Sequence, residues 1–404
     1  MLLRKIMSFA KGLEDSEHPL LGPNLKGLYW CGCWRDSNKL RNTLYNLAVI
    51  CAVTFITSEI IEVYCLRSDI NKMLYSISVS ILSVISASKN IHFTLNQGKL
   101  KMLVNLISTY EISNLNKIED DTIKEIKKYT KYARVVTYTY WILVFATNIG
   151  MIVTPLIKYA SAVYNVDVDS SEMYPEIISS WFPFDKTKKP GYIIASVIHI
   201  LMSTYGALAI GACDMFAITV LTFIKGQLII LNKKCIKIFA SDNNSESNIL
   251  EAIRDCHGRH NILLKIYRLY DSLLSPVMYI YVLICSVMIC CNVVQFTSTD
   301  ISAAQKLWIV QYTFYLISQL FLFCWHGNQV LIESINVDRG VYRSDWWKGD
   351  VQTRKQILLL SGKLKKKFIM HAGPFTVLSV PTFIDILKAS YSFYTLFSQM
   401  HDIK

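Results

Sequence analysis

The fold class of this chain follows from one stretch, residues 192–238, which reads YIIASVIHILMSTYGALAIGACDMFAITVLTFIKGQLIILNKKCIKI. It is apolar almost throughout, and the charged residues that interrupt it are Asp214, Lys225, Lys233, Lys234 and Lys237. A helix of about 45 residues rises roughly 65 Å, about twice the thickness of a bilayer core. The sequence therefore predicts a helix that crosses a membrane and continues into the aqueous phase.

The rest of the chain holds further apolar runs. Of its 404 residues 52% are apolar, and a window of about 19 residues gives candidate spans at 43–64, 73–97, 135–157, 191–224, 272–296, 305–326 and 373–399. A soluble enzyme does not carry seven uncharged runs of this length. We therefore expect an all-α membrane protein with seven transmembrane helices.

Basic residues concentrate in alternate connections between these runs. The segments 1–41, 98–134, 225–270 and 328–370 hold 32 of the 42 lysine and arginine residues, and the opposite connections hold 8. Because basic residues favour the cytoplasmic side, we predict a cytoplasmic N-terminus and an extracellular C-terminus. G-protein-coupled receptors have the reverse orientation, and their Asp-Arg-Tyr and Asn-Pro-x-x-Tyr signatures are absent at the corresponding places.

The polarity of the connections divides the chain into four parts. Residues 1–42 form a cytoplasmic segment, 43–327 hold the first six spans, 328–370 form cytoplasmic anchor helices, and 371–404 form the terminal helix with a short extracellular tail. Helix extensions at about 225–270 are expected to join the anchor helices in a cytoplasmic bundle. The outer loop at 158–190 combines prolines with aromatic residues, for which we favour an anchor at the headgroup level over a lid.

Charge and motif content argue against an enzyme. The net charge of +12 is explained by cytoplasmic loops that face anionic membrane lipid, and no basic run is interleaved with aromatics as nucleic-acid binding would require. His257 and His260 in CHGRH lack the second ligand pair of a metal site. We find no catalytic constellation and expect neither a metal nor a cofactor.

Polar residues inside the spans indicate a pocket. Such residues are costly in a membrane and usually face a cavity, a pore or another helix, although helix packing can explain any one of them. Tyr312 and Tyr315 are three residues apart, so they share a helix face and can form aromatic walls. The other residues that suggest the pocket are Asn148, Gly150, His199, Ser203, Tyr205, Gly206 and Asp214.

The last apolar run carries a polar stripe. The residues that recur there at spacings of three or four, and so share one face, are Asp385, Lys388, Ser392, Thr395 with Leu396, and Gln399. The opposite face carries Ile386, Ala389, Phe393, Phe397 and Met400. This stripe fits a water-filled path to which several subunits each contribute one helix. Packing against the other six spans in a monomer is the alternative.

The same residues resemble the terminal helix of insect odorant receptors. TFIDILKASYSFYTLFSQM, residues 382–400, is similar to the family's pattern of a Phe, an Ile-Leu pair, a Ser-x-Ser and an aromatic-Thr-Leu run. CWHGNQVLIESINVDRGVYRSDWWKGD, residues 324–350, resembles its Cys-x-x-Gly-Asn and Tyr-x-x-x-Trp elements, and SWFPFD at 180–185 and Asp214 also fit. Phe397 departs from the family, which often has Leu there.

The resemblance implies an odorant-gated cation channel in the plasma membrane of sensory neurons. In that family an odorant-tuned subunit forms a tetramer with a shared co-receptor, and cytoplasmic helices hold the subunits together. The terminal helix lines the pore, which implies a hydrophobic gate at Leu396, a polar ring at Gln399, and pore positions at Ser392 and Met400. The family's odorant pocket, in the outer halves of helices two, three, four and six, corresponds to Ser80, Ser83, Asn148, Gly150, His199, Met202, Tyr205, Tyr312 and Tyr315.

Other functions remain open from the sequence. The shared co-receptor has a much longer loop after the fourth span, and the Thr-Tyr-x5-Gln-Phe signature of gustatory receptors is absent from 373–400. A transporter usually contains internal repeats, of which we see none. A metabotropic seven-helix chemoreceptor is a further alternative. The combined pattern favours the odorant-tuned subunit, which binds a small volatile molecule.

Overall fold

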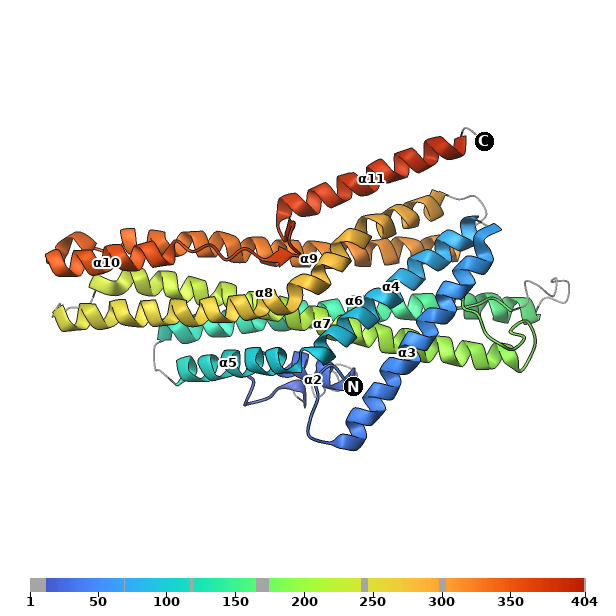
Figure 1. Ribbon diagram of the computed structural model, residues 1–404, viewed down its shortest axis with the longest axis horizontal. Coiled ribbons are helices and arrows are strands. Elements are labelled where there is room, and N and C mark those ends of the chain that lie inside the picture. Colours follow the sequence, from blue (N-terminus) through green and yellow to red (C-terminus); the bar gives the residue numbers. More distant parts are fainter. Residues whose placement is uncertain are drawn as a thin grey trace.

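The computed structural model describes residues 12–68, 70–116, 120–164, 174–240, 246–297 and 303–402 (Figure 1). The α-helices are α2 (Gly22–Trp30), α3 (Lys39–Cys65), α4 (Ile70–Leu95), α5 (Gln97–Leu115), α6 (Asp120–Tyr164), α7 (Gly191–Ile236), α8 (Glu246–Thr297), α9 (Ala303–Tyr342), α10 (Val351–Leu364) and α11 (Val380–Asp402). Short 3-10 turns follow at Leu66–Ser68, Lys237–Phe239 and Trp346–Lys348. Two short strands, β1 (His371–Ala372) and β2 (Thr376–Val377), form a hairpin.

Seven of these helices form the transmembrane part. Within the described residues, α3, α4, α6, α7, α8 and α9 are long and apolar enough to cross a membrane. The seventh is α11, whose 23 residues suffice for a span. It differs from the others because Asp385 and Lys388 interrupt its apolar character. The predicted all-α class and the predicted number of spans are confirmed.

The terminal helix begins later than the sequence predicted. We expected a span over 373–399, but α11 starts at Val380 and the preceding residues form the β1–β2 hairpin. Gly373 adopts a φ of +72°, which glycine tolerates and other residues rarely do. Its N–H donates to the carbonyl oxygen of Ser275 on α8 at 3.1 Å. The apolar residues of 375–379 therefore belong to the hairpin and the residues after it rather than to a helix, and Leu378 among them is buried.

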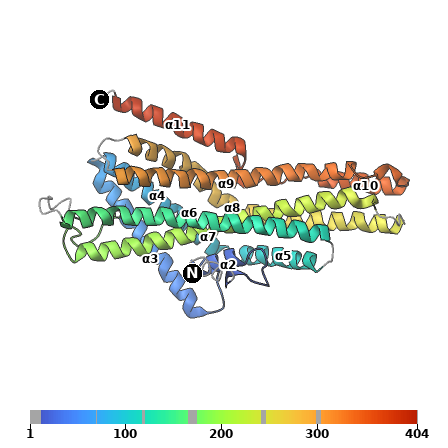
Figure 2. The same cartoon turned by 180° about the vertical axis from the view of Figure 1, so that it is seen from behind.

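Four spanning helices extend far beyond the membrane at one end of the molecule. The helices α6, α7, α8 and α9 have 45, 46, 52 and 40 residues, respectively. Their extensions lie beside α5 and α10 at the left end of Figure 1 and the right end of Figure 2. This end holds the basic connections, so the charge asymmetry places it in the cytoplasm. The predicted continuation of 192–238 beyond the bilayer is confirmed.

The helix α7 forms the centre of the bundle. In its most apolar stretch 89% of the residues are buried, compared with 11% in α3. A helix that is apolar all round is expected to be buried on every side, which explains why residues 192–238 show no polar face. The amino-terminal helix α2 adds to this burial, because Asn24 Nδ2 donates to Thr219 Oγ1 of α7 at 2.7 Å.

The helix α11 contacts the bundle only near its start. Its Phe383 ring meets the Phe321 ring of α9 edge-on with 5.5 Å between centroids, and Ile386 and Ser390 are buried. In both views α11 runs at an angle to α9 and away from it (Figures 1 and 2), and Tyr391 is 68% exposed. One side of α11 therefore has no protein around it within this chain's described part.

Candidate functional site

A cavity of about 100 Å³ lies in the extracellular half of the helix bundle. Its walls come from α3, α4, α6, α7 and α9, and Ile178 of the outer loop closes one side. A single water needs roughly 10–15 Å³ of cavity volume, so the cavity has room for several water-sized groups. The size and position are those of a pocket for one small ligand.

Most of the predicted pocket residues meet at this cavity. The predicted residues that line it are Ser83, Asn148, Met202, Tyr205, Tyr312 and Tyr315. They come from α4, α6, α7 and α9, which are the second, third, fourth and sixth spans. The structure thus brings together residues that are up to 232 positions apart in the chain, from Ser83 to Tyr315.

Three predicted pocket residues lie outside the lining. Ser80 is buried, and its hydroxyl has no hydrogen-bond partner among the described residues. A side chain at Gly150 would meet Gln311 of α9 at 3.1 Å, so this glycine allows a close approach of α6 and α9. The His199 ring hydrogen-bonds to Ser180 Oγ at 2.7 Å. The structure places all three in the packing around the cavity.

The first span also contributes to the cavity, which the sequence did not predict. Val49, Ala52, Phe55 and Ile56 of α3 are part of the lining. Their spacing of three to four residues is visible in the sequence, but it does not distinguish a cavity wall from a surface that faces lipid. The pocket therefore uses five spans instead of the expected four.

The polar groups of the lining are largely engaged within the protein. The Tyr205 hydroxyl accepts from Asn90 Nδ2 at 2.9 Å, and the Tyr312 hydroxyl donates to the Ser78 carbonyl oxygen at 3.3 Å. The indole of Trp308 stacks on the Tyr312 ring with 5.3 Å between centroids. The structure therefore presents mainly the aromatic faces of these tyrosines to the cavity.

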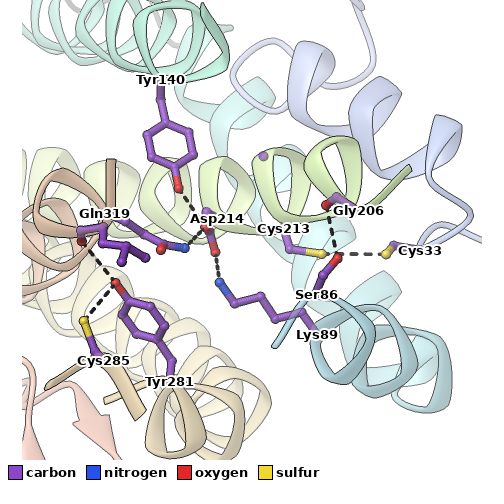
Figure 3. A network of polar contacts seen from close by, with 12 residues as sticks. Cys33, Ser86, Lys89, Tyr140, Gly206, Cys213, Asp214, Tyr281, Cys285 and Gln319 are labelled. Carbon is purple, nitrogen blue, oxygen red and sulfur yellow. Dashed lines mark hydrogen bonds and ion pairs between the residues drawn. The ribbon is translucent and has the colours of Figure 1, made fainter. Parts of the chain in front are cut away.

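A buried ionic network forms the floor of the cavity (Figure 3). Tyr315 lines the cavity, and its hydroxyl lies 3.4 Å from that of Tyr140 on α6. Tyr140 donates to Asp214 Oδ2 at 2.9 Å, and Lys89 Nζ of α4 pairs with Asp214 Oδ1 at 2.5 Å. Gln319 Nε2 of α9 donates to the same carboxylate. Four transmembrane helices thus meet at one carboxylate.

This network satisfies both of its buried charges. Asp214 receives hydrogen bonds from three side chains, which offsets the cost of removing a carboxylate from water. Lys89 Nζ also lies over the Tyr281 ring, 5.2 Å from its centroid. Both charged side chains are only 2% exposed. The arrangement fixes α4 and α7 in one register below the cavity.

The outer loop covers the extracellular end of the cavity. Its Ile178 lines the cavity, and the Trp181 N–H donates to a carbonyl oxygen of α3 at 3.1 Å. Lys186 Nζ lies 3.0 Å from Glu62 Oε1 of α3 and 2.9 Å from Glu176 Oε1. Burial raises the pKa of Glu176, and Lys186 opposes that shift. The loop thus covers the cavity, while Trp181 stays 45% exposed, which is compatible with the anchor at the headgroup level that we favoured from sequence.

The predicted pore residues lie on α11, away from the cavity. The side chains of Ser392, Leu396 and Gln399 are exposed, and the side chain of Met400 lies outside the described residues. Asp385 and Lys388 of the same stripe are exposed as well. The stripe does not pack against the other six spans, so the monomeric packing that the sequence left open is not observed.

A comparison with protein families and relatives supports this fold. The family model described as 7tm Odorant receptor matches residues 69–391. Odorant receptor Or2 of Anopheles gambiae is 20% identical over 395 residues, which cover 96% of this chain and 99% of that protein. The Odorant receptor coreceptor of Anopheles gambiae is 21% identical over 155 residues, which cover 38% of this chain and 32% of that protein.

A solved structure shows the same fold. It is the insect olfactory receptor OR5 from Machilis hrabei in complex with eugenol, with a TM-score of 0.80 and 17% sequence identity. The match covers 96% of this chain and all of that chain. At this identity the likeness establishes the arrangement of the helices.

Proposed function

Because this chain belongs to the 7tm Odorant receptor family, we propose that it is the odorant-tuned subunit of a ligand-gated cation channel. In this proposal the chain forms a tetramer with a shared co-receptor in the plasma membrane of a sensory neuron. A small volatile ligand enters the cavity and opens the channel. The cavity and α11 each contribute to the argument.

The exposed polar stripe of α11 is the observation that carries the proposal. Asp385 and Lys388 are exposed on a helix that must cross a membrane. Charged side chains at that depth face water or protein instead of lipid. A single chain supplies neither around α11, so several copies of this helix around a water-filled path resolve the problem. We propose that Leu396 forms the gate of that path, with Ser392, Gln399 and Met400 lining it.

The cavity fits a small and mostly apolar ligand. Its aromatic walls at Trp308, Tyr312 and Tyr315 offer dispersion contacts and apolar burial, which supply most of the affinity in pockets of this kind. The lining is predominantly hydrophobic, with few polar groups available. We propose this cavity as the odorant site, with Ser83, Asn148, Met202 and the tyrosines in contact with ligand.

A physical route connects the cavity with α11. Tyr315 lies at the cavity floor, and α9 continues from it through Gln319, which is bound to Asp214, to Phe321. The Phe321 ring contacts Phe383 near the start of α11. A ligand that binds one arrangement of α9 more tightly shifts the population toward that arrangement and moves the base of α11. We propose this shift as the gating step.

The cytoplasmic end is proposed as the intersubunit anchor. The segment 328–370 holds the end of α9 and all of α10, and its exposed apolar side chains include Trp347, Val351, Leu358 and Leu359. Exposed apolar residues in an aqueous compartment indicate a protein contact. The basic residues of this end are positioned for contact with anionic lipid headgroups.

The test is whole-cell current from cells that express this chain with and without a co-receptor of the family. A panel of volatiles is applied while intracellular GTP is withheld. We expect odorant-evoked cation current only in the cells that express both chains. A current that requires GTP indicates a metabotropic receptor, and an equal current from this chain alone indicates a channel of the gustatory type.

A further inference from the structure

The buried carboxyl group of Glu59 belongs to the cavity side of α3. Phe55 and Glu59 are the buried side chains of this helix. The lining residues Val49, Ala52 and Ile56 recur at spacings of three and four, and Glu59 continues that series by three more. Glu59 is 0% exposed, although most of α3 faces outward. The carboxyl group therefore points into the bundle from the same stripe that forms the cavity wall.

The carboxyl group of Glu59 is only half satisfied. Its Oε1 accepts from Ser83 Oγ at 3.0 Å, and Ser83 is itself part of the cavity lining. Its Oε2 has no hydrogen-bond partner within the described part of the chain. Lys186, the basic residue that reaches α3 one turn farther out, is engaged by Glu62 and Glu176 instead. The Glu59 carboxyl group can therefore accept a further hydrogen bond, and Ser83 links it to the cavity lining.

Most other polar groups at the cavity differ from Glu59 in this respect. The hydroxyls of Tyr205 and Tyr312 and the amide of Asn148 all bond to other protein groups. Among the groups that line the cavity, the Trp308 indole N–H also lacks a hydrogen-bond partner within the described residues, but it is a donor and not an acceptor. A buried polar group without a partner is costly, and a buried carboxylate more so. A ligand that donates to Glu59 removes this cost, whereas a ligand without a donor leaves it in place.

From this geometry we propose that the cavity selects volatile molecules with a hydrogen-bond donor, and that Glu59 accepts that donor beside Ser83. A primary amine is the best match, because a charge-assisted hydrogen bond is roughly twice as strong as a neutral one. An aliphatic amine is protonated at neutral pH, so it binds as an ammonium that donates to the Glu59 carboxylate and pairs with its charge. An alcohol keeps its proton and donates it. This inference rests on the proposed role of the cavity as the odorant site.

The test compares ligands of matched length on the purified full chain in detergent. The ligands are heptan-1-amine, heptan-1-ol, 1-methoxyhexane and octane, and binding is followed by quenching of tryptophan fluorescence, since Trp308 lines the cavity. Loss of the signal in Trp308→Phe verifies its origin. We expect the amine to bind roughly ten- to a hundredfold more tightly than octane, with the alcohol below the amine and the ether between the alcohol and octane, because an ether oxygen can only accept, as from the Trp308 N–H. Equal binding of all four ligands overturns the proposal.

Two variants of Glu59 separate charge from hydrogen bonding. Glu59→Gln keeps an acceptor but not the charge, so the amine is expected to lose about tenfold in affinity and the alcohol little. Glu59→Met removes both and should reduce the amine and the alcohol to the level of the ether. Glu62→Gln is the matched control, because it removes a carboxylate of the same helix that is paired with Lys186. An amine preference that persists in Glu59→Met also overturns the proposal.

The failure of this inference is distinguishable from failure of the proposed channel. The same ligands are applied to cells that express the chain with a co-receptor. Donor-selective binding to the purified chain without any evoked current supports the inference and contradicts the channel function. Evoked currents of equal sensitivity for amine, alcohol and octane support the channel and contradict the role of Glu59.

Discussion

Two carboxylates buried in the transmembrane bundle have opposite surroundings. Asp214 at the bundle centre has a lysine and two neutral donors around it, from three different helices. Glu59, on the cavity side of α3, has one serine donor and an oxygen without a hydrogen-bond partner among the described residues. The first arrangement holds helices together, and the second leaves binding capacity unused. Burial alone therefore does not reveal the role of an acidic side chain, whereas the set of its hydrogen-bond partners does.

The largest effect is expected from removing Lys89, the cation that pairs with Asp214. Lys89→Met leaves Asp214 ionised and buried without its ion-pair partner, which should cost about 3–5 kcal/mol in the free energy of unfolding. Thermal unfolding of the purified chain measures this loss. The double variant Lys89→Met with Asp214→Asn removes both charges and should recover most of it. A single variant that unfolds like the unmodified chain contradicts the structural role of the pair.

A third buried carboxyl group, Glu111 at the cytoplasmic end, tests how burial and hydrogen-bond partners set the pKa of such a group and its contribution to stability. Glu111 on α5 accepts from the Leu20 N–H at 3.1 Å and lies 3.5 Å from the Tyr129 hydroxyl. Burial raises its pKa to about 7, so the folded state binds the proton more tightly than the unfolded state does. Its contribution to stability is therefore complete below the ordinary pKa of glutamate and is lost as the pH rises through about 7.

The measurement is the stability of the chain at two pH values. Going from about pH 7.5 to about pH 5.5 should add about 2 kcal/mol through Glu111, and Glu111→Gln should lack this gain. His260, whose pKa burial lowers to about 4, stays neutral over this range. The same pH dependence in both proteins assigns it to other groups and refutes the prediction.

Substitutions of Tyr312 in the cavity lining test which part of this aromatic side chain the ligand uses. Tyr312→Ala removes a face that the ligand covers, and roughly tenfold weaker odorant responses are expected, equivalent to about 1.4 kcal/mol. Tyr312→Phe is the matched variant, because the hydroxyl bonds to the Ser78 carbonyl rather than pointing to a free site. Its odorant profile should be unchanged. Dose-response curves at equal surface expression decide, and a Phe variant as impaired as the Ala variant would show that the hydroxyl matters.

The smallest effect is expected for the stability of Glu59→Met. Because Glu59→Met removes one hydrogen bond together with a buried oxygen that lacks a partner, the two effects offset each other, and the free energy of unfolding should change by less than about 1 kcal/mol. Ser83 keeps a partner in the Val79 carbonyl oxygen at 3.4 Å. The comparison between the two acids fails if Glu59→Met destabilises the chain as much as Lys89→Met does.

The helices were predictable from the sequence because the apolar runs are long. The continuous run at 192–238 predicted both the central span and its cytoplasmic extension, and α7 extends over Gly191–Ile236. The start of the terminal helix was not predictable in the same way. Apolar content at 375–380 is compatible with a helix or a packed hairpin, and the turn at Gly373 depends on its contact with Ser275 of α8.

The site was predictable in part. Polar and aromatic residues in apolar spans signalled Asn148, Tyr205, Tyr312 and Tyr315, which do line the cavity. The wall from α3 carried no such signal, because an apolar stripe that faces a cavity has the same composition as one that faces lipid. His199 was misleading for the converse reason, since its polar ring is used by Ser180 in the outer loop.

The shallow packing of α3 makes one wall of the cavity easy to change. A narrow stripe of this helix, from Val49 to Glu59, faces the cavity side, while α7 is buried along most of its length and exposes side chains mainly at its outer end. A substitution in the α3 stripe alters what the cavity accepts without removing support from the rest of the bundle. A substitution in α7 disturbs several neighbours at once. We therefore expect new ligand preferences to arise through substitutions in the α3 stripe, because such substitutions cost little folding stability.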